Sequence, residues 1–426
     1  MVIDTSKVGL NSSNNDQYAF PIINGTDKRG RTINFTIDWG DGTTSDINSS
    51  NYATAGKHTY SSPGTYLVSA TGSIAGFAAY NGGLSGGRRD AQKITQIRRW
   101  GDLNLTGGAN SSGFQGAGNA FRGCTNLVDC IATDLPTFIT GGSGSSDTGI
   151  RGMFTSCSNL NRINRLADWD VSPCNNFNGV FNGCIDLQYD DLSGTIGLNV
   201  SNWDVERSST FYNMFKNVQK CDINMWTSFG GQASGGINFY SMFNGCSNFT
   251  GVGTNLWGSK VSAVTNMHQM FYGCKVFNAN ISGWDTSSCT NMYQMFSGTG
   301  TALGDQMIFN QNIGSWDVSN VTDMRGIFSN CASFDQNLSS WDVNAWSQNS
   351  LATSPITNPG GTFQLSTSNY NALLVAWDNY GFPSMPNGTV NFGSSTYSLT
   401  SPGNAVVNAR NSLISKWGAI SDGGGV

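Results

Sequence analysis

The chain has 426 residues, and its 38% apolar content, with 12 Trp and 24 Phe, is ample for buried cores. Charged residues make up only 12% of the chain, Lys and Arg together number 22, and the net charge is −5. The sequence contains no basic block, so we do not expect nucleic acid as a partner. The 54 Gly residues instead predict many tight turns.

The N-terminal stretch lacks the positively charged start and apolar run of a standard export signal. No run of 18 apolar residues occurs elsewhere in the sequence, so we expect no membrane insertion. We assign residues 1–11 to an N-terminal arm.

The first predicted domain is a small β-sandwich over residues 12–80. Residues 33–39 alternate apolar and polar side chains with the period of a strand, and a turn follows at 40–43. A second strand pair is predicted at 57–60 and 65–70, joined by the turn Ser61-Ser62-Pro63-Gly64.

The order of W-G-D-G-T, H-T-Y and P-G-T-Y-L-V in this domain resembles the PKD-type immunoglobulin-like domain. That resemblance implies a spacer or a ligand-presenting module rather than a catalytic one. Asp38 and Asp41 are weak candidates for metal ligands. Two carboxylates this close in sequence can bind calcium. Capping of the turn by the same carboxylates is the alternative.

From about residue 95 to residue 350 the sequence repeats the motif F-x-x-C-x-x-[LF]. Two degenerate copies begin at Phe215 and Phe296, with Val218 and Thr299 at the Cys position, and successive copies start 25 to 34 residues apart. The six full copies carry the pairs Phe121 and Cys124, Phe154 and Cys157, Phe181 and Cys184, Phe243 and Cys246, Phe271 and Cys274, and Phe328 and Cys331.

A second repeated element is a Trp-Asp pair, clearest at Trp284, Trp316 and Trp341 and extended by Trp169 and Trp203. Apolar residues recur at every third position between the two elements, which predicts short strands and single turns around a core. We interpret the Trp column as core, with an exposed sugar-stacking stripe as the alternative. The recurring Asn and Asp residues are predicted to bond the backbone of the neighbouring coil.

Residues 295–343 follow the phrase M-F-x-x-C-x-x-F-N-x-[ND]-I-x-x-W-D-V-S-x-V-x-x-M closely, apart from Thr299 and a short insertion before Phe309. In this phrase the chain resembles the BspA-like leucine-rich-repeat surface proteins. The resemblance implies a curved solenoid, a surface location and adhesive binding, and it leaves the ligand open.

Residues 351–426 are predicted to form an α/β capping repeat that shields the last hydrophobic coil. Tyr370, Leu373, Leu374 and Trp377 have helical spacing, with Ser366 or Thr367 as the cap and Gly381 as the stop. A strand at 389–392 and a second helix at 405–417 follow. Three Gly-rich stretches, at 107–118, 141–149 and 230–236, are predicted insertions. The expected fold is therefore mainly β: a sandwich, a leucine-rich-repeat-like solenoid and an α/β cap.

Catalytic chemistry has little support in the sequence. The two histidines, His58 and His268, are far apart and lack the spacing of metal ligands or of a triad. We expect no catalytic residue, no cofactor and no resident metal, and we keep a carbohydrate-active enzyme as an alternative because distant Asp residues can meet in a fold. Six of the ten cysteines occupy one motif position, which favours free buried thiols over disulfides.

Two non-catalytic functions remain. The absence of an export signal and the expected free thiols favour a virion protein of a tailed phage, a capsid decoration or a fibre, over a bacterial cell-surface adhesin. The opening Met1-Val-Ile-Asp-Thr-Ser-Lys7, with the PKD-like module and the coils behind it, also resembles virion proteins of marine and cyanobacterial phages. We expect the N-terminal region to contact other virion proteins and the solenoid to bind a host glycan or protein, and we leave a homo-oligomer open.

Overall fold

The computed structural model describes residues 1–9, 12–22, 32–48, 50–74, 76–79, 90–101, 105, 118–138, 149–227, 236–345, 362–380, 388–400 and 402–426. The chain divides into two compact units, Met1–Phe229 and Gly230–Val426. Apart from the last glycine of each stretch, the three predicted Gly-rich insertions lie outside the described residues, as does the predicted helix stop at residue 381.

The described chain is mainly β, with many short strands in open sheets and few helices. The strands of the first unit are β1 (Val2–Asp4), β2 (Gln17–Ala19), β3 (Asn34–Asp38), β4 (Thr44–Asn48), β5 (Lys57–Thr59), β6 (Thr65–Leu67), β7 (Ser69–Ser73), β8 (Ile94–Ile97), β9 (Asp129–Cys130), β10 (Arg162–Ile163), β11 (Leu198–Asn199) and β12 (Ile223–Asn224). Those of the second unit are β13 (Ile237–Asn238), β14 (Val264–Asn266), β15 (Gly388–Asn391) and β16 (Gly418–Ser421). The α-helices are α1 (Tyr52–Ala55), α2 (Thr367–Asn379) and α3 (Ala405–Trp417).

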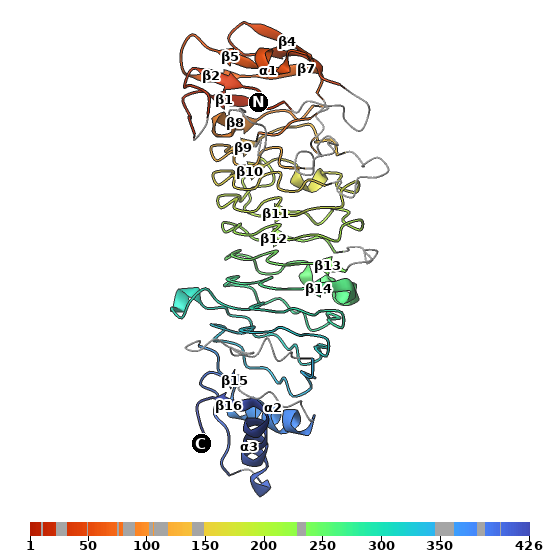
Figure 1. Ribbon diagram of the computed structural model, residues 1–426, viewed down its shortest axis with the longest axis vertical. Helices are drawn as coiled ribbons and strands as arrows, with labels where there is room; N and C mark the ends of the chain where they lie inside the picture. Colours follow the sequence, from red (N-terminus) through yellow and green to blue (C-terminus); the bar gives the residue numbers. More distant parts are fainter. Residues whose placement is uncertain are drawn as a thin grey trace. The chain divides into compact units, whose positions relative to one another are not determined.

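The sandwich lies in the red and orange part of the chain (Figure 1). β3 is its central strand, and it pairs antiparallel with β4 and with β7. Its alternating pattern places Phe35 and Ile37 inside, where Ile37 is fully buried, and Trp39 is buried directly after the strand. The predicted pairing of residues 57–60 with 65–70 is wrong, because β5 pairs with β2 and β6 pairs with β1. The turn between them therefore carries the chain from one sheet to another.

The segment 1–9, which we expected within an N-terminal arm, contains a strand of the main sheet. β1 pairs antiparallel with β6 of the sandwich on one side and with β8 on the other. β8 then pairs in parallel with β9, and β9 with β10, which gives the order β10-β9-β8-β1-β6. β1 therefore joins the sandwich and the first repeats in one continuous sheet.

Successive repeats are connected through the backbone of the motif itself. Counting from the motif Phe as position 0, the N–H groups at positions −2, 0 and +2 donate to carbonyls of the next repeat in six of the eight copies. In the first unit Gly152, Phe154 and Ser156 donate over 2.7, 2.9 and 2.7 Å. The corresponding N–H groups of Gln269, Phe271 and Gly273 in the second unit donate over 2.8, 3.1 and 2.8 Å.

A left-handed backbone sets the direction of these N–H groups. Position −2 has φ between 49° and 64° in all eight copies: Asn119, Gly152, Gly179, Asn213, Ser241, Gln269, Gln294 and Gly326. Position +2 is also left-handed in seven copies: Gly123, Ser156, Gly183, Asn217, Gly245, Gly273 and Asn330. Because L side chains disfavour this region, Gly and Asn recur at both positions.

The core consists of ring columns that cross from repeat to repeat. Phe154 stacks on Phe181 with ring centroids 6.0 Å apart, and Phe243 stacks on Phe271 at 5.7 Å. A second column of Trp includes Trp284 and Trp316 at 6.1 Å. The predicted core residues of the repeats are all buried to 3% exposure or less, namely Phe121, Cys124, Phe154, Cys157, Phe181, Cys184, Phe243, Cys246, Phe271, Cys274, Phe328, Cys331, Trp284, Trp316 and Trp341.

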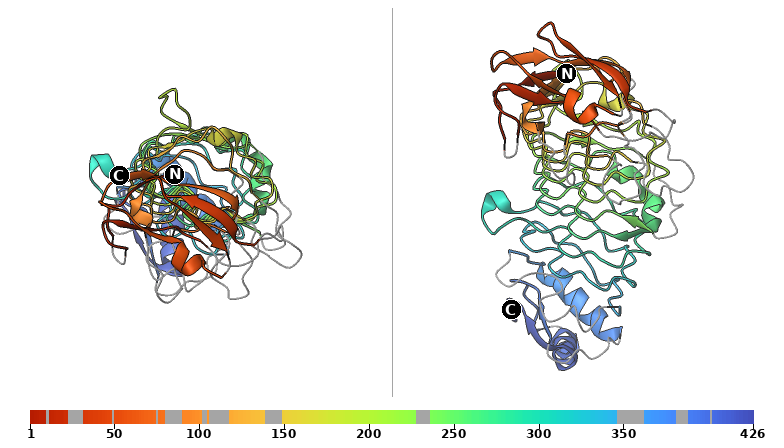
Figure 2. Two further views of the ribbon diagram at one scale, coloured as in Figure 1. Left: turned by 90° about the horizontal axis from the view of Figure 1, so that it is seen from above. Right: turned by 45° about the horizontal axis from the view of Figure 1, so that its top comes forward.

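The last segment of the second unit contains both longer helices, which lie side by side with β15 and β16 in the blue part of the chain (Figures 1 and 2). The side chain of Ser366 caps α2 by accepting the N–H of Asn369, as predicted. All four residues with helical spacing in α2 are buried. Phe363 continues the Phe columns, 5.7 Å from Phe328 and 6.4 Å from Phe334.

The left-handed backbone at position +2 predicts that the effect of a substitution at Gly183 on stability depends on the residue introduced. Gly183 has a φ of 78°, and a Cβ there would meet only ordinary contacts at 3.5 Å or beyond. Gly183→Val should lower the free energy of unfolding by about 1–2 kcal/mol, because a β-branched residue is strained there. Gly183→Asn should cost much less, since Asn217 and Asn330 occupy this position in other repeats. Denaturant unfolding followed by circular dichroism measures both, and equal losses would contradict this role for the backbone.

Candidate functional site

The weak metal candidates of the sandwich cap turns. Asp38 accepts the N–H of Gly40 at 2.9 Å. Asp41 accepts the N–H and hydroxyl of Thr43 at 3.0 and 2.6 Å, and its second oxygen lies 2.7 Å from Nε2 of His58. Desolvation raises the pKa of Asp41, but the hydrogen bonds from Thr43 and His58 together outweigh it and lower the pKa to about 2. Within the described residues no group of three His, Cys, Asp or Glu could hold a metal ion.

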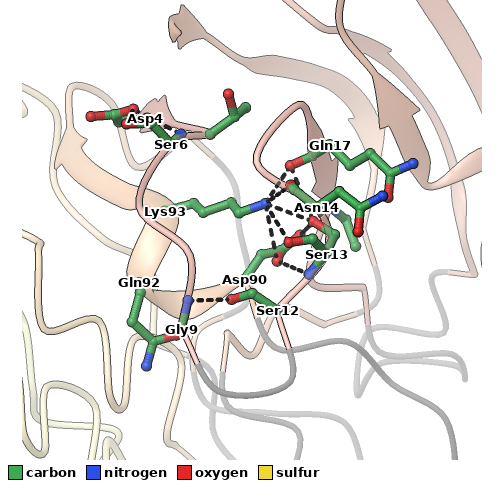
Figure 3. Close-up of polar contacts among 12 residues, drawn as sticks. Asp4, Ser6, Gly9, Ser12, Ser13, Asn14, Gln17, Asp90, Gln92 and Lys93 are labelled. Carbon is green, nitrogen blue, oxygen red and sulfur yellow. Dashed lines mark hydrogen bonds and ion pairs between the residues drawn. The ribbon is translucent and has the colours of Figure 1, made fainter. Parts of the chain in front are cut away.

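A buried ion pair lies between the sandwich and β8 (Figure 3). The Lys93 ammonium is fully buried, and it lies 3.6 Å from Asp90 Oδ1. It donates to the carbonyls of Asn14 and Gln17, both at 2.6 Å, and to the Ser13 hydroxyl at 2.8 Å. A buried charge often marks a reactive site, but here the ammonium already has protein acceptors for its protons. The pair therefore fastens the segment 12–19 to the repeats.

Asp90 bonds the same segment. The Lys93–Asp90 pair with its bonds to residues 13–19 is called the Lys93 clamp. Its carboxylate accepts the N–H of Ser13 at 2.8 Å, the hydroxyl of Ser13 at 2.5 Å and the N–H of Ala19 at 2.7 Å. Nothing in the sequence indicates this arrangement, because Lys93 is separated from its acceptors by more than 75 residues.

All ten cysteines are buried free thiols. Burial raises the pKa of Cys174, Cys221 and Cys289 to about 12, so these groups stay protonated at neutral pH. The motif Cys has a directional role, because Cys157 donates to the carbonyl of Phe121 in the preceding repeat at 3.0 Å and Cys274 donates to that of Phe243 at 3.0 Å. These thiols hold repeats together and offer no nucleophile.

Four of the five predicted Trp residues, Trp203, Trp284, Trp316 and Trp341, likewise bond across repeats, whereas the buried indole N–H of Trp169 has no partner among the described residues. The indole N–H of Trp284 donates to the carbonyl of Thr254, and that of Trp316 donates to Ile281, at 3.0 and 3.1 Å. Trp257 belongs to the same column, 5.6 Å from Trp284, and the motif search missed it because Gly258 stands where the other copies have Asp. Since the rings are buried and stacked, the column offers no sugar-stacking stripe.

The recurring Asp after Trp does not reach the neighbouring repeat. Asp285 and Asp317 each accept the N–H of the residue two positions later, at 3.1 and 2.9 Å, and so close their own turns. Bonds between repeats come from a different column. Asn278 accepts the N–H of Asn310 at 2.9 Å, and Asn310 accepts that of Asp335 at 2.9 Å. The predicted polar ladder therefore exists at the Asn or Asp that follows the last aromatic residue of the motif, and the Asp after Trp takes no part in it.

A row of four partly exposed side chains at position −3 in the second unit is the surface feature most suited to recognition. We call it the aromatic stripe, and it consists of Tyr240, His268, Tyr293 and Arg325. The His268 ring stacks between the two Tyr rings, with centroid distances of 4.4 and 4.7 Å. The guanidinium carbon of Arg325 lies 5.2 Å from the centroid of the Tyr293 ring. Asp323 holds this guanidinium through two bonds of 2.9 and 2.8 Å.

An amide row accompanies the stripe, formed by Gln269 and Gln294 at position −2 and by Asn244 at position +1. Asn244 Nδ2 donates to Gln269 Oε1 at 3.3 Å, and Gln269 Nε2 donates to Gln294 Oε1 at 2.8 Å. This surface is not evident from the repeated motif, because its residues are not constant from copy to copy. Alignment of the motif copies on their Phe would have found aromatic side chains recurring at position −3.

Two parts of the chain match known families. Residues 139–251 and 237–352 match a family described as Mycoplasma protein of unknown function, DUF285. Residues 7–75 match the PKD domain, in agreement with the resemblance seen in the sequence. No curated protein and no solved structure matches the chain significantly.

The buried clamp predicts a large penalty for removing its cation. Lys93→Met should lower the free energy of unfolding by about 3–5 kcal/mol, because the Asp90 carboxylate would stay buried without its partner. Lys220→Met is the matched control: the half-exposed Lys220 lies 3.4 Å from Asp186, and its loss should change stability by less than about 1 kcal/mol. Urea unfolding of both variants tests the prediction, and a similar small change in both would contradict a clamp.

The thiols predict a sharp difference in reactivity between the folded and unfolded chain. Iodoacetamide at neutral pH should add nothing to the native protein and should modify ten thiols after denaturation. The reason is burial, which removes access and holds the thiols protonated. Intact-protein mass spectrometry counts the adducts, and rapid modification of any thiol in the native state would refute this assignment.

Proposed function

We propose that this chain, which belongs to the DUF285 family and carries an N-terminal PKD domain, is a non-catalytic surface protein that binds through its repeats. In this proposal the repeats are the coils of a solenoid, and the sandwich presents them. The PKD and repeat domains together support a surface adhesin-like role.

The observation that carries this proposal is the contrast between core and surface within one motif. Positions 0 and −1 are apolar and buried in every copy. Position −3 differs from copy to copy: Gly118, Arg151, Asn178, Tyr212, Tyr240, His268, Tyr293 and Arg325. A constant core with a variable outer column is the pattern of a scaffold whose surface is adapted to a partner.

Catalysis has no support among the described side chains. The buried charges are matched by protein partners, the cysteines are buried, and His58 and His268 lie in different units. We therefore propose binding without turnover, with a host glycan or a host protein as the ligand. In the described part of the chain, none of the helices has the length and apolar character needed to cross a membrane.

A second candidate is a virion protein, a capsid decoration or fibre of a tailed phage that contacts other virion proteins through its N-terminal region. Ten buried free thiols favour it, because such a chain suits assembly in a reducing cytoplasm. Both candidates bind a surface through the repeats. They differ in whether the chain is displayed on a cell or on a virus particle.

Binding to intact cells tests the main proposal. The full chain, labelled with a fluorophore, should bind a bacterial or animal cell surface saturably and should be displaced by excess unlabelled chain. A panel of glycosidase and protease substrates incubated with the same preparation should remain intact. Turnover of a substrate, or no saturable binding to any surface, would contradict the proposal.

Fractionation of the organism that produces the chain tests whether it is displayed on a cell or on a virus particle. Mass spectrometry of purified virions and of a cell-surface fraction should find the chain in one of them. Presence in the cell-surface fraction alone would exclude the virion candidate.

A further inference from the structure

Three neighbouring surface positions of the second unit form an uncharged, hydrogen-bonding face. They are position −5 (Asn238, Asn266, Asn291 and Asp323), position −3, which is the aromatic stripe, and position −2, where Gln269 and Gln294 are partly exposed and Ser241 and Gly326 are buried. Asp323 and Arg325 are the only Asp, Glu, Lys or Arg residues in these columns, and they pair with each other through two bonds. Their charges cancel locally, so the face has no excess charge to attract an ion.

The histidine of the stripe adds no charge at neutral pH. Burial lowers the pKa of His268; nearby Asp323 raises it and nearby Arg325 lowers it further, and the net shift is downward. The imidazole is therefore neutral, with one ring nitrogen that donates and one that accepts.

We propose that this face is a binding site for an uncharged polysaccharide whose chain runs along the repeats over the aromatic stripe. The proposal rests on the proposed function and names the ligand class for it. It commits to a neutral glycan, and anionic glycans and peptides are the alternatives that the test separates.

The side chains of the stripe have polar groups that the protein does not use. Among the described residues, neither ring nitrogen of His268 has a hydrogen-bond partner, and the hydroxyl of Tyr293 has none either. Gln294 accepts from Gln269, and its amide Nε2 has no partner among the described residues. These groups lie on partly exposed side chains of consecutive repeats, where they can donate to and accept from sugar hydroxyls.

The stacking fixes how a ligand would approach. Each face of the His268 ring lies against a Tyr ring, so the ring edges, with the His268 nitrogens and the Tyr293 hydroxyl, are the groups left for a ligand. The rings follow each other at 4.4 and 4.7 Å, a spacing that suits a polymer carrying hydroxyls at every unit better than a single small molecule. The stack also holds the side chains in place before binding, which lowers the entropy cost of recognition.

The two alternatives fit this face less well. An extended peptide that adds a strand needs unpaired backbone groups. The N–H groups of Gln269 and Gln294 already donate to the next repeat, at 2.8 and 3.0 Å, and the N–H of Ser241 donates to the His268 carbonyl at 2.8 Å. An anionic glycan needs an available cation, and the guanidinium of Arg325 is engaged by Asp323.

The test uses the full chain and isothermal titration calorimetry with three classes of probe: the neutral polysaccharides dextran, mannan and laminarin, the anionic heparin, and gelatin as an extended peptide. The informative variant is the double substitution His268→Phe with Tyr293→Phe. It keeps three stacked rings and removes the ring nitrogens and one hydroxyl, so it should fold like the parent chain. Tyr212→Phe, at position −3 of the first unit, is the matched control.

We expect binding of at least one neutral polysaccharide, with little dependence on salt and an about tenfold loss of affinity in the double variant. The control should bind like the parent chain. A preference for heparin or gelatin, binding to none of the neutral probes, or neutral binding that the double variant retains would overturn the proposal.

Cell binding by the same variants distinguishes a failure of the proposed ligand class from a failure of the proposed function. If the parent chain and the double variant bind cells equally, the stripe is not the site and the proposed function stands. If the parent chain binds no surface, the proposed function fails, and the ligand class fails with it.

Discussion

The repeats depend on one backbone arrangement: left-handed residues two positions before and two positions after a buried Phe. In six of the eight repeats, three N–H groups, at positions −2, 0 and +2, donate to carbonyls of the next repeat. Each such bond adds only about 1 kcal/mol net, but an unpaired buried N–H would cost more, so the arrangement has to recur. The ring columns, the thiol bonds and the indole bonds all follow from the stacking that it sets.

This arrangement divides the motif between structure and recognition. Because the backbone bonds and the inward side chains hold neighbouring repeats together, the outward side chain at position −3 is free to change without loss of the fold. In the second unit that position became aromatic in three successive copies and formed a stack. The candidate binding face is therefore a consequence of regular stacking, in which one outward position recurs at nearly constant spacing.

The sandwich is more closely attached to the repeats than a spacer module on a linker would be. β1 pairs with strands of both parts, and the Lys93 clamp bonds the loop at 12–17. The rings of Phe77 and Phe121 also meet, with centroids 5.1 Å apart. Within the first unit the sandwich therefore covers the beginning of the repeat stack, as a capping element does in other repeat proteins.

The repeat boundaries, the buried Phe, Cys and Trp columns and both helices of the last segment could be predicted from the sequence alone, because they follow from the local spacing of apolar residues. The strand partners of residues 57–70, the place of β1 and the Lys93 clamp were decided only by the tertiary structure. Their partners lie more than 30 residues away, and nothing local specifies them. The same holds for the stripe at Tyr240, His268 and Tyr293. Its residues differ in the sequence and become one surface only when the repeats stack.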